Sequence, residues 1–395
     1  MICDSYKTEK LYDTAPYAAE FTAKVRSVEE TKNGCAVILD KTLFFPEEGG
    51  QSCDCGTLNG VKVAHVSIAN GVITHFCETP PAEIGETVAG KIDFAPRFRN
   101  MQNHTAEHIV SGLVHTLYSY NNVGFHLGHD EVTMDYDGTL SPEDLETIEK
   151  RANEVVYQNL AVTAVYYTKE EAAALFYRSK IEIDGPIRIV TIPDVDVCAC
   201  CAPHVAHTGE IGAIKLLSAE RYKGGTRVHM LAGSDAREDY AAKHAAVAKI
   251  SAALSVKPDE AASAVERLMG ENAALGARLT LLQKALCRAY AEGVPTGTVL
   301  YFRVFSPDEM NANGLRVLAD RLLSRCRFCA LFLKSEKNDG SFQFLLASSE
   351  INISDLYKDF SARLNAKGGG RPPFVSGRVE AEEKVISDYF TGIKL

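Results

Sequence analysis

The chain lacks the features that direct a protein into a membrane or out of the cell. Its first twenty residues are charged and contain no short apolar core of the kind found in signal peptides. No uninterrupted apolar run approaches the length needed to span a bilayer. We therefore expect a cytoplasmic protein with no membrane partner.

An excess of positive charge is also absent. The 52 acidic residues outnumber the 42 basic ones, and the formal net charge is −10. Because non-specific affinity for nucleic acids comes from neutralised phosphates, this balance argues against a protein that coats nucleic acid indiscriminately. A specific RNA partner remains compatible with it. Three local basic groups are candidate RNA contacts or simply solvated charges: Arg97 with Arg99, Arg221 with Lys223 and Arg227, and Lys367 with Arg371.

Neither disorder nor a disulfide framework is indicated. Apolar residues make up 46% of the 395 residues, which is enough for two or three packed domains. The 11 cysteines are an odd number and include one dense group, Cys198, Cys200 and Cys201. In a reducing compartment such a group favours metal binding over disulfides.

The pattern of apolar residues predicts an α+β protein. Residues 1–95 alternate short strand-like runs with Gly, Asn and Pro, which predicts a small β-barrel or a sandwich. Residues 96–235 predict an α+β domain, with one helix over about 97–120 and a second opened by Ser141 as N-cap and Pro142 at the first helical position. Strands follow in RIVTIPDVDV, EIGAIKLLSAE and TRVHMLA.

The remaining chain predicts a helical segment and a second mixed domain. Residues 236–292 are rich in Ala, Leu, Glu and Lys and predict helices with a break near Pro258. A heptad seam within 265–286 carries a polar residue at one a position, which favours a coiled-coil-like homodimer, or else a helical hairpin that packs on its own domain. Residues 293–395 predict a compact α/β domain that carries the segment KGGGRPP. The seam consists of Val265, Leu268, Asn272, Leu275, Leu279, Leu282 and Leu286.

Four residues have a spacing that suits one metal ion. His104 and His108 are four apart on a predicted helix, so both imidazoles emerge from one face, and Cys200 and His204 lie in a turn-rich stretch that supplies two more ligands. Three nitrogens and one sulfur favour Zn²⁺ over cations that prefer oxygen. Cys201 is the second choice for the thiolate, Cys198 is expected to be a buried neighbour, and His115 is an alternative ligand that fits a core or capping role better.

Four segments carry a resemblance to a known family. NHTAEH at 103–108, CCAPHVAHTGEIG at 200–212 and FFPEEGGQSCDCG at 44–56 resemble the signature blocks of the alanyl-tRNA synthetase editing domain, which also occurs in free-standing editing proteins of the AlaX type. KGGGRPPFVSG resembles the glycine-rich motif of the synthetase C-terminal domain, which the long form of these proteins retains. The resemblance implies the zinc ligands already chosen from spacing. It also leads us to expect neither an amino-acid-activating domain nor an anticodon-reading domain.

This sequence departs from the family pattern at two places. Cys-Ala-Pro-His replaces the usual Gly-Gly-Thr-His at the end of the metal block, and Glu107 replaces a small or hydroxyl residue. Both changes affect the expected shape of the pocket more than the metal.

The resemblance implies a zinc-dependent hydrolase that acts in trans on mischarged alanine tRNA by attack of water on the aminoacyl ester. An alanine pocket cannot exclude glycine by size and rejects an added hydroxyl only about a hundredfold, so Ser-tRNA(Ala) and Gly-tRNA(Ala) are the expected substrates. Four protein ligands are typical of structural zinc, whereas catalytic sites usually keep an open position, so the role of the ion stays open. The alternatives are a tRNA-binding protein without catalysis and, from HTAEH, an inverted-zincin protease with Glu107 as base.

For the substrate pocket, Gln51 in the GGQ turn is the first choice of polar contact, against an exposed amide in a simple hairpin turn. Glu107 is a candidate base or partner of the metal site, or a helix-face charge. Weaker candidates for hydrogen bonds are Asn103, Thr105, His126 and Thr208. For tRNA, exposed amides and a cation are offered by the glycine-rich segment, unless it is a flexible loop: Gly368, Gly369, Gly370 and Arg371.

Overall fold

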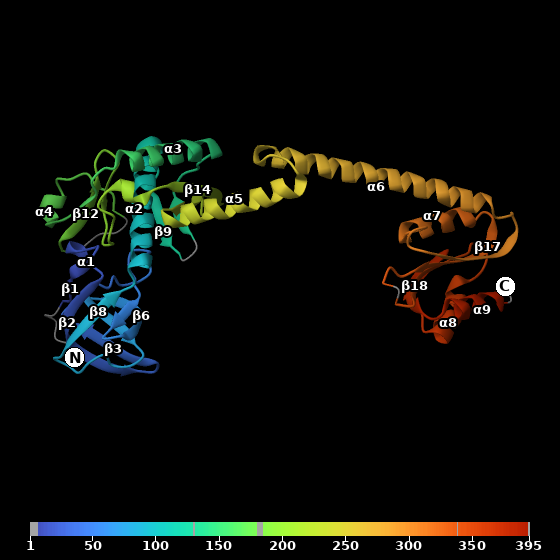
Figure 1. Cartoon of the computed structure of the whole chain (residues 1–395), viewed down its shortest axis with the longest axis horizontal. Helices are drawn as coiled ribbons and strands as arrows, with labels where there is room; N and C mark the ends of the chain where they lie inside the picture. Colours follow the sequence, from blue (N-terminus) through green and yellow to red (C-terminus); the bar gives the residue numbers. More distant parts are fainter. Residues whose placement is uncertain (1–6, 129–130, 180–184, 338, 394–395) are drawn as a thin grey trace. The chain divides into compact units, whose positions relative to one another are not determined.

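The computed structural model describes residues 7–128, 131–179, 185–337 and 339–393. Packing divides the chain into two compact units, residues 1–249 and 250–395, each of which contains helices and strands (Figure 1). The predicted α+β class is therefore confirmed. Within the described ranges, no helix is both long enough and apolar enough to cross a bilayer.

Six strands of the first unit close a barrel in the order β2-β3-β7-β6-β5-β8. Asn-Gly pairs with positive φ at Asn59–Gly60 and Asn70–Gly71 form the turns on either side of β6, because the tight hairpins require left-handed residues. The short strands β1 (Glu9–Lys10) and β4 (Lys41–Thr42) pair beside helix α1 (Leu11–Thr14). The barrel strands are β2 (Glu20–Thr31), β3 (Gly34–Leu39), β5 (Gly56–Leu58), β6 (Val61–Ala69), β7 (Val72–Cys77) and β8 (Thr87–Ile92).

A buried ion pair fastens the first turn of the next helix to the barrel. Arg97 is 0% exposed, and its guanidinium donates to both carboxylate oxygens of Asp54 and to the carbonyl oxygen of Leu43. Asp54 also accepts from the backbone amide of Phe45 at 2.6 Å, which closes the loop 45–54. The prediction that Arg97 is a surface RNA contact is therefore wrong, because its guanidinium is buried and pairs with the Asp54 carboxylate.

Helix α2 (Phe94–Tyr118) runs from the barrel into the second half of this unit (Figure 1). The four-stranded antiparallel sheet β14-β15-β10-β9 and helix α3 (Pro142–Gln158) pack with it around one apolar core. Ser141 caps α3 as predicted, since its hydroxyl accepts from the amide of Asp144. The strands of this sheet are β9 (Asn122–Leu127), β10 (Val132–Tyr136), β14 (Ile214–Tyr222) and β15 (Gly225–Ala232).

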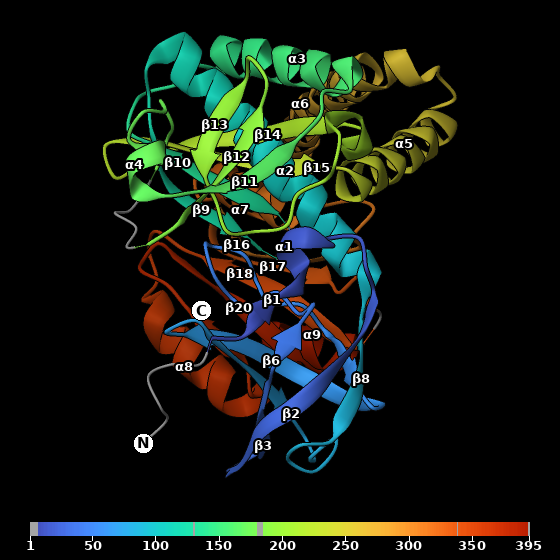
Figure 2. The same ribbon diagram turned by 90° about the vertical axis from the view of Figure 1, so that its left-hand side faces the viewer.

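A three-stranded sheet, β11-β12-β13, lies beside α2 (Figure 2). Gly112 on α2 allows this contact, because a Cβ at that position would lie 2.3 Å from the carbonyl oxygen of Val195 in the turn before β13. The approach places β13 against the helix face that carries the predicted histidines. The elements are β11 (Thr163–Tyr167), α4 (Lys169–Ala172), β12 (Ile187–Ile192), β13 (Asp196–Ala199) and the 3-10 turn η1 (Thr208–Ile211).

Two long helices follow, with the predicted break at Pro258. They are α5 (Ser234–Leu254) and α6 (Ala261–Glu292), separated by the turn η2 (Pro258–Glu260). Five apolar members of the predicted heptad seam are between 39% and 64% exposed: Val265, Leu268, Leu275, Leu279 and Leu282. The alternative in which this stripe packs on its own domain is not supported.

The second unit is built on the mixed sheet β16-β17-β18-β20-β19. Helix α7 packs on one face with the end of α6, while α8 and α9 pack on the other face around a cluster of phenylalanines. The elements are β16 (Thr298–Phe305), α7 (Ala312–Leu322), β17 (Cys326–Lys334), β18 (Ser341–Ala347), α8 (Ile353–Leu364), β19 (Lys367–Gly369), β20 (Phe374–Glu380) and α9 (Glu383–Thr391).

Candidate metal centre

The four predicted metal ligands come together in the first unit. One nitrogen or sulfur atom from each of His104, His108, Cys200 and His204 lies within 4.8 Å of the others. The Sγ atom of Cys200 is 3.5 Å from Nε2 of His104 and 3.4 Å from Nε2 of His204. Residues about 100 positions apart in the chain therefore meet in one cluster.

Two of the imidazoles have an acceptor on the side that faces away from the cluster. Nδ1 of His104 donates to Oε1 of Gln51 at 2.8 Å, and Nδ1 of His108 donates to a carboxylate oxygen of Asp196 at 2.8 Å. A proton on Nδ1 leaves the lone pair of Nε2 directed at the cluster. Hydrogen bonds of this kind accompany metal-ligating histidines and set their tautomer.

His204 is held in the same way by a hydroxyl group. Oγ1 of Thr105 lies 3.0 Å from Nδ1 of His204 and donates its own proton to the carbonyl oxygen of Met101 at 2.8 Å. The hydroxyl therefore accepts from His204, and all three rings take the same tautomer.

The electrostatics of the cluster suit a divalent cation. Burial lowers the pKa of His204 well below its ordinary value, so its ring stays neutral, which is the form that binds a metal. Burial also raises the pKa of the Cys200 thiol well above its ordinary range, because a thiolate removed from water is unfavourable and the charge of Arg188 does not offset this loss. A bound cation would supply the compensating charge, and the donor set of three nitrogens and one sulfur fits Zn²⁺.

The other predicted ligand candidates lie outside this cluster. Cys201 contacts the carboxylate of Glu48 and is not among the four clustered ligands. Cys198 is buried, as expected, beside Asp196. His115 lies further along α2, and its Nδ1 is buried with no hydrogen-bond partner in the described part of the chain. The geometry thus favours Cys200 as the thiolate ligand.

Gln51 is buried and contributes to the cluster, so the alternative of an exposed amide in a simple turn is wrong. The turn that carries it packs against β9, where the amide of Leu127 donates to the carbonyl of Gly50. A Cβ at position 50 would lie 2.4 Å from the carbonyl oxygen of Phe125, so only glycine permits this approach. Nε2 of Gln51 is buried and, among the described residues, has no acceptor. It is available as a donor to a ligand at the cluster.

Glu107 is also buried and is not an exposed helix-face charge. One of its oxygens accepts from Ser111 at 2.8 Å and from Asn122 at 2.6 Å, and the other lies 3.9 Å from Nε2 of His108. The carboxylate therefore lies at the edge of the cluster with a fixed orientation.

The weaker pocket candidates divide into two groups. Thr105 is part of the cluster, and the exposed His126 lies beside Phe125, whose ring centroid is 4.8 Å from that of His104. Asn103 instead hydrogen-bonds Asp235 and the amide of Ala232, which ties α2 to β15.

The last weak candidate, Thr208, has a structural contact. Its hydroxyl donates to the carbonyl oxygen of Val155 at the end of α3. The structure does not bring Asn103 or Thr208 to the metal ligands.

The first part of the glycine-rich segment, Lys367–Gly369, forms the edge strand β19, while Gly370 and Arg371 lie beyond its end. β19 pairs with β20, and a Cβ at Gly368 would lie 2.3 Å from the carbonyl oxygen of Ser376. Gly369 has open space around it and Arg371 is exposed. The pairing register sets Lys367 opposite Arg378, so both cations lie on one face of the sheet.

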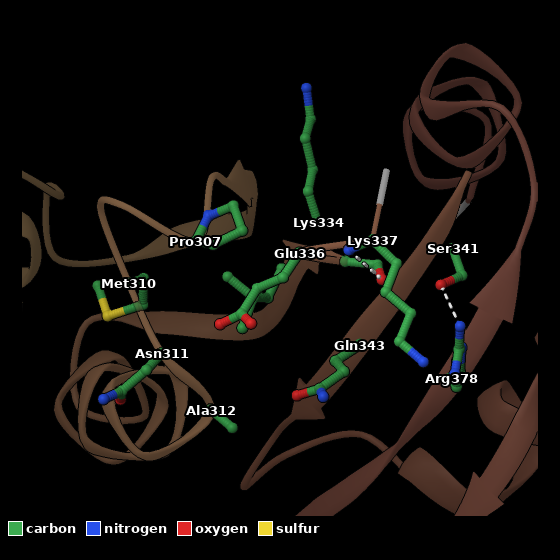
Figure 3. A pocket seen from close by; sticks show the side chains of 12 residues that line it. Pro307, Met310, Asn311, Ala312, Lys334, Glu336, Lys337, Ser341, Gln343 and Arg378 are labelled. Carbon is green, nitrogen blue, oxygen red and sulfur yellow. Dashed lines mark hydrogen bonds between the residues drawn. The ribbon is translucent and has the colours of Figure 1, made fainter. Parts of the chain in front are cut away.

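Arg378 also lines a hollow of about 420 Å³ between the start of α7 and the end of β17 (Figure 3). Its guanidinium donates to Ser341 at 2.6 Å and pairs with Asp339 at 2.8 Å. Lys337 and Gln343 line the same hollow. The surface beside β19 is therefore polar and carries several cations.

Two contacts of the cluster were not predicted from the sequence. Asp196 binds His108, and Arg178 in turn donates two hydrogen bonds to the Asp196 carboxylate, at 2.7 and 2.9 Å. Burial would raise the pKa of Asp196, but these hydrogen bonds outweigh it and lower the pKa. The sequence did contain an indication that Asp196 lies near the metal ligands. Positions 196, 198 and 200 alternate along an extended segment, so their side chains share one face with Cys200. Arg178 has no comparable signal.

Comparison with known proteins assigns the class. Three family models match the chain: tRNA synthetases class II (A) over residues 4–95, the threonyl and alanyl tRNA synthetase second additional domain over 187–229, and the DHHA1 domain over 296–387. The second of these includes Cys200 and His204. The chain is thus built from domains that accompany aminoacyl-tRNA synthetases.

Individual relatives narrow this class. The chain is 28% identical to the alanyl-tRNA editing protein AlaX-L of Pyrococcus horikoshii, over 96% of both chains. It is 32% identical to the alanine–tRNA ligase of Natronomonas pharaonis and 30% identical to that of Pyrococcus abyssi, over 95% and 100% of this chain but only 42% and 44% of those ligases. The chain spans less than half the length of the ligases it matches. Its resemblance to alanyl-tRNA editing proteins of the AlaX type, in the long form, is confirmed.

Proposed function

We propose that this protein is a zinc-dependent hydrolase that deacylates mischarged alanine tRNA in trans. The observation that carries the proposal is the cluster of three buried imidazoles and one thiol, each ring with its Nδ1 proton directed away from the cluster. The similarity to AlaX-L over nearly the whole chain supports the substrate class. The protease alternative is set aside, because Cys200 and His204 join the two helical histidines and the relatives act on tRNA.

His104, His108, Cys200 and His204 would hold the ion. When bound, zinc supplies positive charge that polarises an ester carbonyl, activates water or holds the substrate amino group. Water attacks the aminoacyl carbonyl carbon, the ester bond to the terminal ribose breaks, and the ribose hydroxyl takes up a proton. The free amino acid and the uncharged tRNA are the products.

The residues around the cluster have distinct parts in this reaction. Gln51 keeps His104 oriented through its oxygen and offers its unpartnered Nε2 to the substrate. Glu107 presents a fixed carboxylate at the edge of the cluster, where it orients water or the substrate amino group. His126 is exposed beside Phe125, where it can contact the approaching RNA end.

We propose serine and glycine as the amino acids removed. A synthetase pocket built for alanine admits glycine and rejects serine only about a hundredfold, whereas a second site that hydrogen-bonds the serine hydroxyl can discriminate by about ten-thousandfold. The buried donor Nε2 of Gln51 is the group we assign to that hydroxyl.

We further propose a separate role for each domain of the chain. The barrel (1–95) and the editing domain (96–235) form the metal site, the helical segment (236–292) joins two subunits through the exposed stripe of α6, and the C-terminal domain (293–395) binds tRNA. Its contacts would come from the glycine-rich segment and from the two cations that face each other across β19 and β20. These residues are Gly368, Gly369, Gly370 and Arg371, together with Lys367 and Arg378. We propose the cytoplasm as the compartment in which the protein acts.

The test is deacylation of alanine tRNA charged with serine, glycine or alanine, with and without a chelator. We expect chelator-sensitive loss of serine and glycine while alanine stays attached. A protein that binds tRNA but leaves all three esters intact would instead be a tRNA-binding protein without catalysis.

A further inference from the structure

The strongest unassigned feature of the site is the buried carboxylate of Asp196. Its side chain is 2% exposed, as is that of His108, and the two are joined by the 2.8 Å hydrogen bond to Nδ1. Arg178 donates to both carboxylate oxygens. A bidentate guanidinium contact fixes the plane of a carboxylate as well as its position.

Asp196 differs from the acceptors of the other two rings in its charge. Gln51 and Thr105 are neutral acceptors, whereas Asp196 is a carboxylate whose two oxygens are both hydrogen-bonded to Arg178. A hydrogen bond to a charged acceptor is shorter and about twice as strong as one between neutral groups. A carboxylate behind an imidazole also raises the basicity of the ring as a ligand. We therefore expect the hydrogen bond of His108 to be the strongest of the three.

The backbone is arranged for this contact. Gly112 lies one turn beyond His108 on α2, and a side chain there would collide with the carbonyl oxygen of Val195, the residue before Asp196. Gly112 thus allows α2 to approach the start of β13 closely. This approach brings the Asp196 carboxylate within hydrogen-bond distance of His108, which a wider separation would prevent.

A second metal ion is the competing explanation, because His108, Asp196 and Cys198 also have ligand atoms within 4.8 Å of one another. Arg178 argues against it. Both oxygens of Asp196 already accept from the guanidinium, so a cation bound there would lie beside a fixed positive charge. The three residues are better explained as support for the first site.

We propose that Asp196, clamped by Arg178, is a positioning residue that fixes His108 in the Nδ1-protonated tautomer and thereby sets the metal affinity of the cluster. This inference rests on the proposed zinc binding, but it assigns a role to two residues that the metal-site motifs leave out.

The test measures zinc affinity of the full-length protein by competition with a chromophoric chelator, without any tRNA. Asp196→Ala should weaken zinc binding by about 10- to 100-fold. Asp196→Asn should weaken it less, because the amide oxygen can still accept the Nδ1 proton without the charge. Arg178→Met should also weaken it, since the carboxylate loses its clamp.

The chain offers a matched control. Arg227 makes the same two-bond contact with Asp135, at 2.6 and 2.8 Å, between β15 and β10. Asp135→Asn should leave zinc affinity unchanged. Because Asp196→Ala leaves the Arg178 guanidinium without its partner and thereby lowers stability, the Co²⁺ absorption of Asp196→Asn is the second readout. A changed ligand-field band with retained binding shows that the ring has moved while the protein stays folded.

The outcomes separate the two proposals. Wild-type protein that binds no zinc would refute the proposed metal site and this inference with it. Wild-type protein that binds zinc, together with Asp196→Ala and Asp196→Asn variants of unchanged affinity and unchanged Co²⁺ spectrum, would overturn the positioning role alone.

Discussion

The ion pair between Arg97 and Asp54 gives the sharpest prediction on how the site is held together. It joins the first turn of α2, the helix of His104 and His108, to the loop 45–54, which carries Gln51. Arg97 is fully buried and also donates to the carbonyl of Leu43 at 2.6 Å. The substitution Arg97→Met removes these donors and keeps most of the apolar volume of the side chain.

The expected loss in the free energy of unfolding follows from the burial of both Arg97 and Asp54. Without Arg97, the Asp54 carboxylate would keep the amide of Phe45 as its donor and remain charged inside the protein. Removal of one partner of a buried pair costs about 3–5 kcal/mol, whereas replacement of both by apolar residues is often neutral or stabilising. We therefore expect Arg97→Met to lower the free energy of unfolding by about 3–5 kcal/mol. The double variant Arg97→Met, Asp54→Leu should regain most of this loss.

The loss of stability in Arg97→Met should depend on pH in one direction. Burial already raises the pKa of Asp54 in spite of the neighbouring guanidinium, and loss of Arg97 raises it further. An acid whose pKa is higher in the folded than in the unfolded state loses stability as the pH rises from the unfolded-state pKa through the folded-state pKa, so the defect of Arg97→Met should shrink as the pH falls through this range.

The assay is urea unfolding followed by far-ultraviolet circular dichroism, because the chain contains no tryptophan. Hydrogen exchange of residues 44–54 would show whether the loop of Gln51 loosens. Arg227→Met is the control: its pair with Asp135 is partly exposed, and we expect a cost of about 1 kcal/mol or less. A loss for Arg97→Met no larger than that of the control would refute the reasoning.

Other predictions concern the metal, the helix, stability at low pH and tRNA. Cys200→Ala should abolish zinc binding measured by atomic absorption, whereas Cys201→Ala should retain about one zinc per chain; the reverse result would reassign the ligand. Leu275→Glu, at an exposed seam position of α6, should shift sedimentation from dimer to monomer, and a wild-type monomer would contradict the proposed interface. His75 is buried and its pKa is lowered to about 4, so the unfolded state takes up a proton first and stability should fall by up to about 3 kcal/mol between pH 6.5 and 4. His75→Gln should lose this dependence in urea titrations at several pH values. Arg371→Glu should weaken tRNA binding and reduce its salt slope by about 1, and an unchanged slope would exclude a phosphate contact.

Local features of the sequence were sufficient to predict the long helices α2, α3, α5 and α6. Ser141 and Pro142 mark the start of α3, and Pro258 marks the break between α5 and α6, because capping and the missing amide of proline act within a few residues. The spacing of His104 and His108 places both rings on one helix face for the same local reason. Such signals need no knowledge of distant contacts.

The candidate RNA contacts could be predicted only as charges. The sequence does not distinguish Arg97 from Arg99. In the structure Arg97 is buried against the barrel, whereas Arg99 is partly exposed and pairs with Asp235. The glycines at 368–370 read equally as a loop or a strand until the register with β20 is known. Burial and strand pairing depend on partners far along the chain, and composition does not specify them.

The sequence by itself determined which residues can bind a metal and which segments carry them, since ligand type and short spacing are local properties. Only the tertiary structure showed that the thiol of Cys200, and not that of Cys201, lies with the three histidines, because successive residues of an extended segment point to opposite sides. It also decided that Gln51, Thr105 and Asp196 orient the three rings, since each of these contacts is a hydrogen bond whose geometry arises when the barrel, α2 and β13 pack together.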